Sequence, residues 1–258
     1  MMPETYSQAQ AIPLPNTELV IRLKNVCKSF GKNHVLRDLD LELKKGENKV
    51  VLGKSGSGKS VLIKCIIGLV KPDSGSIYVL GKNVPQLKHT ELDAIRAKIG
   101  FLFQSNALYD SMSVRENLEF PLRRHRKGLD KNQVNELVEE ALVNVGLIHT
   151  IDMQPSELSG GMKKRIALAR TLILKPEIIL YDEPTTGLDP ITGKDISTLM
   201  CDLAKKYNTS SIVISHDLNC VKIVANSILM LIDGKCYAQG TYTELNESTD
   251  LKVKEFFI

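Results

Sequence analysis

The sequence predicts an α/β fold with a mostly parallel core sheet, an N-terminal antiparallel β-subdomain and a helical insert. Three observations support this prediction. Short apolar segments of strand length alternate with helical patterns along most of the chain, as expected for βαβ units. Two β-prone segments, residues 19–23 and 35–43, come first and are separated by a turn at residues 31–33. Between residues 113 and 171 the strand signal fades and helical periodicity dominates.

The composition is that of a globular protein. Of the 258 residues, 43% are hydrophobic and 25% are charged, which excludes a disordered or fibrous chain. The net charge is 34 − 30 = +4, which is too small to indicate a nucleic-acid partner. The five cysteines form no CxxC pair, so neither a zinc site nor a disulfide framework is expected.

The ends of the chain differ from its middle. Residues 1–18 are rich in Pro, Gln and Thr and are interpreted as a flexible N-terminal extension, which leaves residues 19–258 as one domain. The first 20 residues contain no Lys or Arg and no apolar core, so no secretory signal is expected. No apolar run approaches the roughly 18 residues of a membrane span. A C-terminal tail, residues 241–258, is expected to be helical, to pack on its own domain and to leave no room for a further regulatory domain.

The core strands are expected to be buried on both faces. Their nearly continuous apolar character is typical of parallel strands that helices cover on both sides. The candidates are residues 49–52, 99–103, 178–181, 211–214 and 228–232. A helical subdomain of about residues 105–172 interrupts this alternation, and apolar residues recur at helical spacing over residues 131–147.

The strongest local signal is the sequence GKSGSGKS at residues 53–60, which fits GxxxxGK(S/T) between a strand and a helix. Small residues let successive backbone N–H groups surround a phosphate, and the helix that follows adds its positive N-terminal end. The Lys59 ammonium can reach the β- and γ-phosphates, and the Ser60 hydroxyl can bind Mg²⁺. The alternative is a flexible Gly/Ser turn. The candidate nucleotide-binding residues here are Gly53, Lys54, Ser55, Gly56, Ser57, Gly58, Lys59, Ser60 and Val61.

A second signal is an apolar strand that ends in two carboxylates, Asp182 and Glu183. Carboxylates at the end of a buried strand are unfavourable unless a cation or water occupies the site. Asp182 is suited to the surroundings of Mg²⁺, and Glu183 is suited to polarise an attacking water. The alternative is a surface acidic turn before Pro184.

A third signal is the turn at residues 158–162, in which Ser159 is a natural helix N-cap. The glycines that follow leave the first helical N–H groups uncovered, so this helix end can bind an anion. The alternative is an ordinary capped helix. The candidate residues are Ser159, Gly160, Gly161 and Met162.

Together these motifs resemble the nucleotide-binding subunit of ABC transporters, a branch of the P-loop NTPases, over roughly residues 19–245. Six segments match the family in order: Walker A at 53–60, the Q-loop at Gln104, the signature at 158–162, Walker B at 178–183, the D-loop at 187–190 and the switch-histidine segment at 215–217. Phe30 matches the aromatic residue that stacks on adenine.

The resemblance implies an ATPase that uses ATP and Mg²⁺. Glu183, His216 and Gln104 would be catalytic, and Ser60, Gln104 and Asp182 would hold Mg²⁺. Most of these residues follow predicted strands, so they should gather at the carboxyl edge of the sheet, where open α/β sheets bind ligands.

The resemblance also implies a head-to-tail dimer that encloses two ATP molecules. The signature turn would contact the γ-phosphate held by the partner, with Asp189 near the joint. ATP binding would close the pair, and hydrolysis would let it reopen.

Finer details resemble the Mla/Mce-type lipid transporters, notably residues 103–114, 120–122 and 161–170. This resemblance implies a peripheral ATPase at the cytoplasmic face of the inner membrane. It would act under a permease with an Mce-domain partner and move phospholipid between two membranes. Met162 also fits quaternary-amine importers, so an amine or amino-acid importer remains an alternative. A soluble non-transport ABC ATPase is a further alternative, and no nucleic-acid partner is expected.

Overall fold

The parallel sheet forms the centre of the chain. The computed structural model describes residues 18–257, so the expected extension at residues 1–18 lies outside the described part except for Glu18. The six strands follow the order β10-β9-β3-β8-β7-β6, and all neighbours are parallel except β10, which runs antiparallel to β9. The five predicted core strands are confirmed, whereas β10 was not predicted. Their bounds are β3 Asn48–Leu52, β6 Ile99–Leu102, β7 Ile178–Asp182, β8 Ser210–Ser215, β9 Ser227–Ile232 and β10 Lys235–Gly240.

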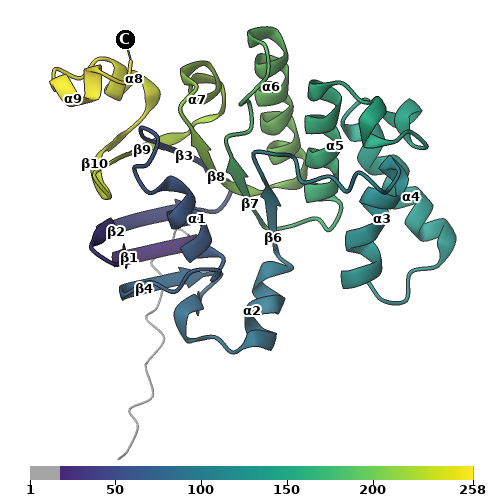
Figure 1. Cartoon of the computed structure of the whole chain (residues 1–258), viewed down its shortest axis with the longest axis horizontal. Helices are drawn as coiled ribbons and strands as arrows, with labels where there is room; N and C mark the ends of the chain where they lie inside the picture. Colours follow the sequence, from purple (N-terminus) through teal and green to yellow (C-terminus); the bar gives the residue numbers. More distant parts are fainter. Residues whose placement is uncertain (1–17, 258) are drawn as a thin grey trace, which may run out of the picture.

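A second, antiparallel sheet lies at one end of the molecule (Figure 1). Its order is β2-β1-β4-β5, with bounds β1 Leu19–Phe30, β2 Asn33–Lys44, β4 Ser74–Val79 and β5 Lys82–Asn83. The predicted antiparallel pair is confirmed, although both strands are longer than predicted and the turn shortens to Gly31 and Lys32. Register shifts along β1 coincide with Asn25, which has a φ of 49°. This irregularity explains why the sequence pattern faded midway along the strand.

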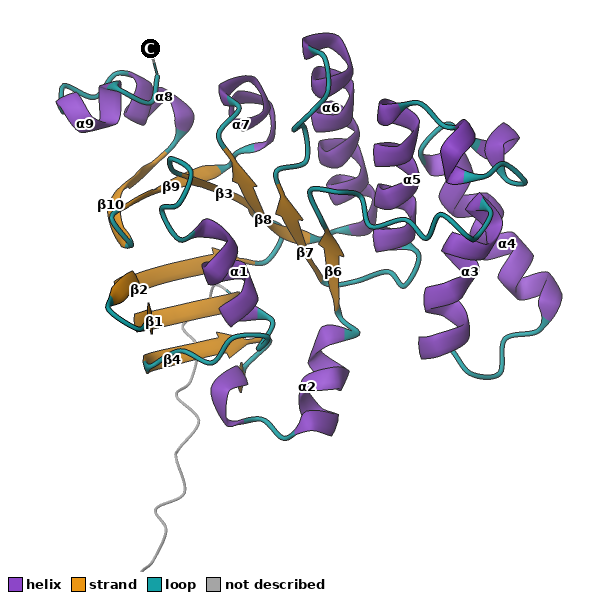
Figure 2. Cartoon of the chain, in the orientation of Figure 1, coloured by secondary structure: helices purple, strands orange, loops and turns teal. Residues whose placement is uncertain are grey.

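Helices α3, α4 and α5 cluster at the opposite end, where Figure 2 shows no strand among them. Ser113 and Asp130 cap α3 and α4 through side-chain bonds to backbone N–H groups, which explains where these helices begin. The helices are α1 Lys59–Ile66, α2 His89–Arg96, α3 Val114–His125, α4 Lys131–Asn144, α5 Gly160–Leu172, α6 Pro190–Tyr207, α7 Leu218–Val224, α8 Tyr242–Asn246 and α9 Leu251–Lys254. In the described part of the chain, 3₁₀ turns lie at Val84–Gln86, Ile148–Thr150 and Pro155–Glu157.

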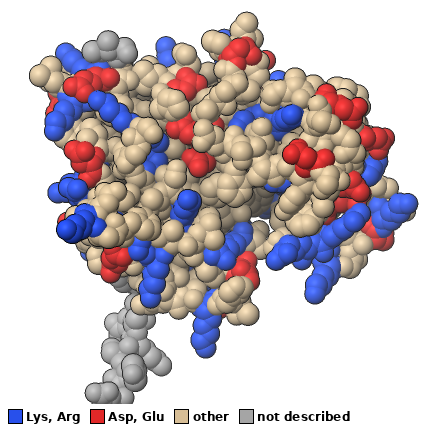
Figure 3. Space-filling model, in the orientation of Figure 1, with Lys and Arg blue, Asp and Glu red and all other residues tan. Residues whose placement is uncertain are grey.

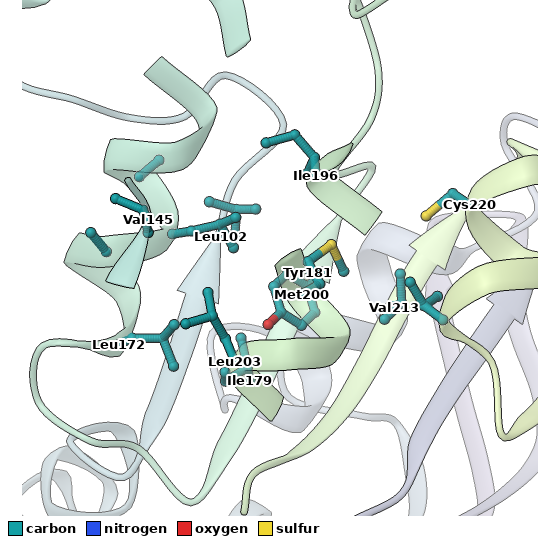
Figure 4. Packing of buried hydrophobic residues seen from close by; sticks show 14 of the residues in the cluster. Leu102, Val145, Leu172, Ile179, Tyr181, Ile196, Met200, Leu203, Val213 and Cys220 are labelled. Atoms are coloured by element: carbon teal, nitrogen blue, oxygen red, sulfur yellow. The ribbon is translucent and has the colours of Figure 1, made fainter. Parts of the chain in front are cut away.

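The two faces of the parallel sheet are covered by different layers. Along β3, Val50 and Leu52 join a core cluster with the helices, whereas Val51 joins a cluster with the antiparallel sheet and α1. Figure 4 shows Tyr181 of β7 beside Met200 of α6 within the first cluster. Because both faces are buried, the strands are apolar throughout, as predicted.

Helix α6 follows β7 and precedes β8, so it runs from the carboxyl ends of the parallel strands back to their amino ends. Asp189 caps its first turn through the backbone N–H groups of Ile191 and Thr192. At its far end, Tyr207 bonds to Asn144 of α4, and the Lys206 ammonium lies 2.6 Å from the Asn144 side-chain oxygen. The start of α6 is therefore joined to the helical cluster through one uninterrupted helix.

The surface mixes charges of both signs. In Figure 3 acidic and basic side chains are scattered over the visible face, and basic side chains gather over the α3 and α4 end. Within residues 18–257, no helix has both the length and the apolar character needed to span a bilayer.

Candidate nucleotide-binding site

One cavity of about 690 Å³ opens at the carboxyl edge of the parallel sheet. Most of the predicted loop, Gln104, both carboxylates and the histidine line it, as expected from their positions after strands. The residues lining it are Val35, Lys54, Ser55, Gly56, Gly58, Lys59, Ser60, Val61, Gln104, Asp182, Glu183, Ile214 and His216.

The loop between β3 and α1 has the backbone shape of a phosphate cradle. Gly56 and Gly58 have φ values of 80° and 105°, which residues with a Cβ atom rarely adopt. A Cβ atom on Gly58 would lie only 2.8 Å from the carbonyl oxygen of Val35. These positions therefore require glycine, and the N–H groups at the start of α1 remain uncovered for an anion.

Lys59 lies inside this loop. Its ammonium donates to the carbonyl oxygens of Gly53 at 2.6 Å and Lys54 at 3.0 Å. Burial lowers the pKa of Lys59, while the charges of Glu183 and Asp182 act to raise it. The cation is therefore held between the loop and the two carboxylates, where a bound phosphate would meet it.

The two carboxylates are in different surroundings. Asp182 ends β7. Its pKa is raised mainly by burial and also by the negative charge of Glu183. Glu183 has a φ of 50°, and its N–H donates to the carbonyl oxygen of Ile214 at the end of β8. Its carboxylate lies 2.8 Å from the Nδ1 atom of His216. This pair fixes the direction of the Glu183 carboxylate in the cavity.

The remaining predicted residues lie outside this cavity. Phe30 is 51% exposed, and the Lys28 ammonium lies 5.3 Å from its ring centre. Ser159 caps α5 by accepting from the N–H of Met162, as predicted. Gly161 packs so closely on Thr192 that a Cβ atom would lie 2.7 Å from its methyl group. The signature turn and the Asp189 cap are thus neighbours within one chain. The predicted residues in this group are Phe30, Gly53, Ser57, Ser159, Gly160, Gly161, Met162 and Asp189.

Sequence reasoning missed several residues of the site. Val35 and Ile214 line the cavity, although neither carries chemistry that a motif search would detect. The buried Thr185 hydroxyl donates to Asp217 at 2.8 Å and so joins the segments that follow β7 and β8. Asp217 belongs to the switch-histidine motif, but no pattern marked Thr185.

A second chamber of about 570 Å³ shares Val35, Lys54, Ser55 and Gly56 with the first. Its far wall includes Glu255 and Phe256 from the C-terminal tail. Val253 of α9 is buried, so the tail packs on its own domain.

Comparison with known proteins identifies the family of the chain. Residues 36–186 match the profile described as ABC transporter. The chain is 39% identical over 262 residues to Protein TRIGALACTOSYLDIACYLGLYCEROL 3, chloroplastic, from Arabidopsis thaliana, covering 93% of this chain and 74% of that protein. It is also 39% identical over 237 residues to the intermembrane phospholipid transport system ATP-binding protein MlaF of Haemophilus influenzae, covering 92% and 89%.

Two further similarities extend the comparison. The methionine import ATP-binding protein MetN of Campylobacter jejuni is 37% identical over 252 residues, covering 92% of this chain and 75% of that protein. The dimeric ATP-binding cassette MJ0796, solved in a post-hydrolysis state with ADP and Pi, aligns with a TM-score of 0.78 and 34% identity, covering 86% and 98%. The chain therefore belongs to the ABC transporter family, as an ATP-hydrolysing cassette.

Proposed function

We propose that this chain supplies the energy for phospholipid transport between the inner and outer membranes. The observation that carries the proposal is the 39% identity to MlaF, because the match covers 92% of this chain and 89% of that protein. The resemblance of residues 103–114 and 161–170 to the same transporter type supports it.

The residues of the cavity fit ATP with Mg²⁺. The glycine backbone of the loop and the Lys59 ammonium suit a triphosphate, and the hydroxyl, amide and carboxylate oxygens of Ser60, Gln104 and Asp182 suit Mg²⁺. The metal would neutralise phosphate charge there. Phe30 is exposed and available to stack on adenine.

The chemistry of the cavity centres on Glu183. Its side chain is 12% exposed and bonded to His216, so the carboxylate is held in one orientation. In the proposed role Glu183 accepts a proton from the attacking water, and His216 positions Glu183 and contacts the γ-phosphate. Gln104, on the segment after β6, responds to the metal or the water.

We propose that two copies assemble head to tail around two nucleotides. The cavity is open, and the signature residues Ser159–Met162 lie outside it, at an uncovered helix end that suits a phosphate. A second copy would bring its signature turn to the first copy's cavity, with Asp189 at the joint. The dimeric state of MJ0796 supports this arrangement.

The proposed partners are permease subunits and an Mce-domain protein, with the chain peripheral at the cytoplasmic face of the inner membrane. In this proposal residues 105–172 form the helical subdomain that passes closure to the permease. The half-buried ring of Phe101 and the exposed ring of Phe103 line a shallow apolar hollow with Leu69, which offers a contact surface to such a partner.

The ATPase roles are tested with two substitutions. Glu183→Gln keeps the shape of the site but removes the base, so we expect ATP binding to persist while turnover stops and a dimer accumulates in ATP. Lys59→Ala removes the cation inside the loop, so nucleotide binding itself should be lost. Unchanged hydrolysis by Glu183→Gln, or retained nucleotide affinity in Lys59→Ala, contradicts the assigned role.

The substrate is tested by purifying the chain with its membrane partners and measuring bound lipid by mass spectrometry. Phospholipid transfer between vesicles that requires ATP and stops in the Glu183→Gln variant supports the proposal. The similarity to MetN favours an amino-acid importer as the second candidate. Stimulation of ATPase activity by an amine or amino-acid binding partner, without lipid transfer, would contradict the phospholipid proposal.

A further inference from the structure

A lysine that forms no ion pair within residues 18–257 is buried between the signature helix and the Q-loop. Lys164 lies on α5, one turn after Gly160, and its side chain is 1% exposed. The Lys164 ammonium donates to the backbone carbonyl oxygen of Gln104 at 3.1 Å. Burial lowers the pKa of Lys164, and no charged neighbour contributes to the shift.

The other buried lysines have clear electrostatic partners. Lys49, 7% exposed, lies 3.0 Å from the Glu47 carboxylate and 2.6 Å from the Ser227 hydroxyl. Lys59 lies in the field of Glu183 and Asp182. Lys164 differs from both, because no carboxylate charge offsets its burial and its hydrogen bond is to a neutral backbone carbonyl.

Stability does not explain this lysine. Removing an ammonium group from water is unfavourable, and a single bond to a neutral acceptor offsets only part of that penalty. Methionine has similar length and would fill the same space without a charge. The presence of a lysine at this position is therefore explained by the group to which its ammonium donates.

The segment that Lys164 holds has little regular structure of its own. Residues 103–113 form neither helix nor strand, and both Asn106 and Ala107 have positive φ values, of 64° and 50°. The side chain of Gln104 lines the nucleotide cavity, while its carbonyl oxygen is bonded to α5. The bond therefore joins a residue of the cavity to the helix that begins at the signature turn.

We infer that Lys164 is a positioning residue, whose ammonium fixes the backbone of Gln104 to α5 so that Gln104 follows the signature helix. The inference rests on the proposed role of Gln104 in hydrolysis. A charged donor suits this task, because charge-assisted hydrogen bonds are shorter and stronger than neutral ones. Movement of α5 on dimer closure then moves the Gln104 backbone in the same chain.

The test compares Lys164→Met and Lys164→Gln with wild type in the full-length chain, measuring melting temperature, kcat and KM for ATP. Lys164→Met should melt at or above the wild-type temperature. Its kcat should fall by about tenfold, because small displacements of a reacting group have large effects on rate. KM should stay within about twofold, because the phosphate loop is untouched. Lys164→Gln keeps a donor without the charge, so it should recover part of the lost kcat.

Lys49→Met is the matched control, because it removes a buried lysine that has a carboxylate partner. It should lower the melting temperature, since Glu47 loses its counter-ion, and leave kcat of the folded protein unchanged. A normal kcat in Lys164→Met overturns the inference. A Lys164→Met variant that melts well below wild type, together with an equal loss of kcat in Lys164→Gln and Lys164→Met, also overturns it. Gln104→Ala separates the two proposals: normal turnover there contradicts the role of Gln104 and the inference together. Impaired turnover in Gln104→Ala with normal turnover in Lys164→Met contradicts the inference alone.

Discussion

Asn117 on α3 is the polar residue on which the loop before that helix depends most. The side chain is 0% exposed, and its Nδ2 group lies 3.0 Å from each of three carbonyl oxygens. Its Oδ1 atom accepts from the backbone N–H of the loop at 2.8 Å and from a guanidinium at 3.4 Å. The partners are Tyr109, Met112, Ser113 and Arg170.

Asn117→Ala removes all five bonds and leaves part of the loop backbone without partners. A typical internal hydrogen bond contributes about 1 kcal/mol net. Because the three donor contacts share one NH₂ group and one bond is long, we expect a loss of about 3 kcal/mol rather than the full sum. For a chain of this size the loss corresponds to a decrease of about 6 to 12 °C in melting temperature. Thermal unfolding followed by circular dichroism measures it.

Two further variants sharpen this test. Asn117→Asp has nearly the same shape but turns a carboxylate toward three carbonyl oxygens. It should therefore be at least as destabilising near neutral pH and recover partly on acidification, as the carboxyl is protonated. Asn132→Ala, at an exposed position of α4, should change stability by no more than about 0.5 kcal/mol. A shift below about 2 °C for Asn117→Ala would refute the reasoning.

Three other predictions address the nucleotide site. Gly58→Ala forces a Cβ atom toward the Val35 carbonyl oxygen at a φ of 105°, so nucleotide affinity should fall by about tenfold or more; a titration with fluorescent nucleotide giving wild-type affinity would contradict this. Asp182→Asn should stop hydrolysis yet stabilise the nucleotide-free chain. Because burial raises the pKa of Asp182 in the folded state, its charge destabilises the fold above that pKa. The stability gained by Asp182→Asn should therefore shrink as the pH falls through that pKa, where the wild-type carboxyl is protonated. Melting curves at several pH values measure this, and a gain in stability that grows on acidification would count against it. The Lys54–Glu255 ion pair, 3.1 Å long, is exposed, so Glu255→Gln should lower the melting temperature by less than about 2 °C, and a larger shift would mean that the tail stabilises the loop more than this contact allows.

The sequence predicted those elements whose pattern is local. The core strands were predicted because burial on both faces makes them apolar throughout, and the phosphate loop because residues 53–60 fit GxxxxGK(S/T), in which Gly58 has a φ of 105°. The three undetected strands, β4, β5 and β10, have another character. β4 reads SGSIYV and pairs with the distant strand β1, and β5 has only two residues. β10 reads KCYAQG and is a half-exposed edge strand held by pairing with the buried β9. None of the three is marked by its own composition.

The candidate site also contains residues that the sequence predicts and residues that only the structure reveals. Residues that follow buried strands were predicted to converge, and they do, because the carboxyl ends of parallel strands meet at one edge. Thr185, Asn117 and Lys164 act through contacts with segments 8 to 60 positions away. No short pattern encodes such a partner, so these residues became visible only from the three-dimensional arrangement.

Helix α6 is long and straight enough in its bonding to carry a movement from one of its ends to the other. Eighteen residues at 1.5 Å each make a rod about 27 Å long, capped by Asp189 at one end and bonded to Asn144 at the other. A rod of continuous backbone hydrogen bonds hardly compresses, so a tilt imposed at its capped end must be matched at the Asn144 contact. A fluorophore attached near that contact would thus register nucleotide-driven changes from the opposite side of the sheet, without touching the chemistry it monitors.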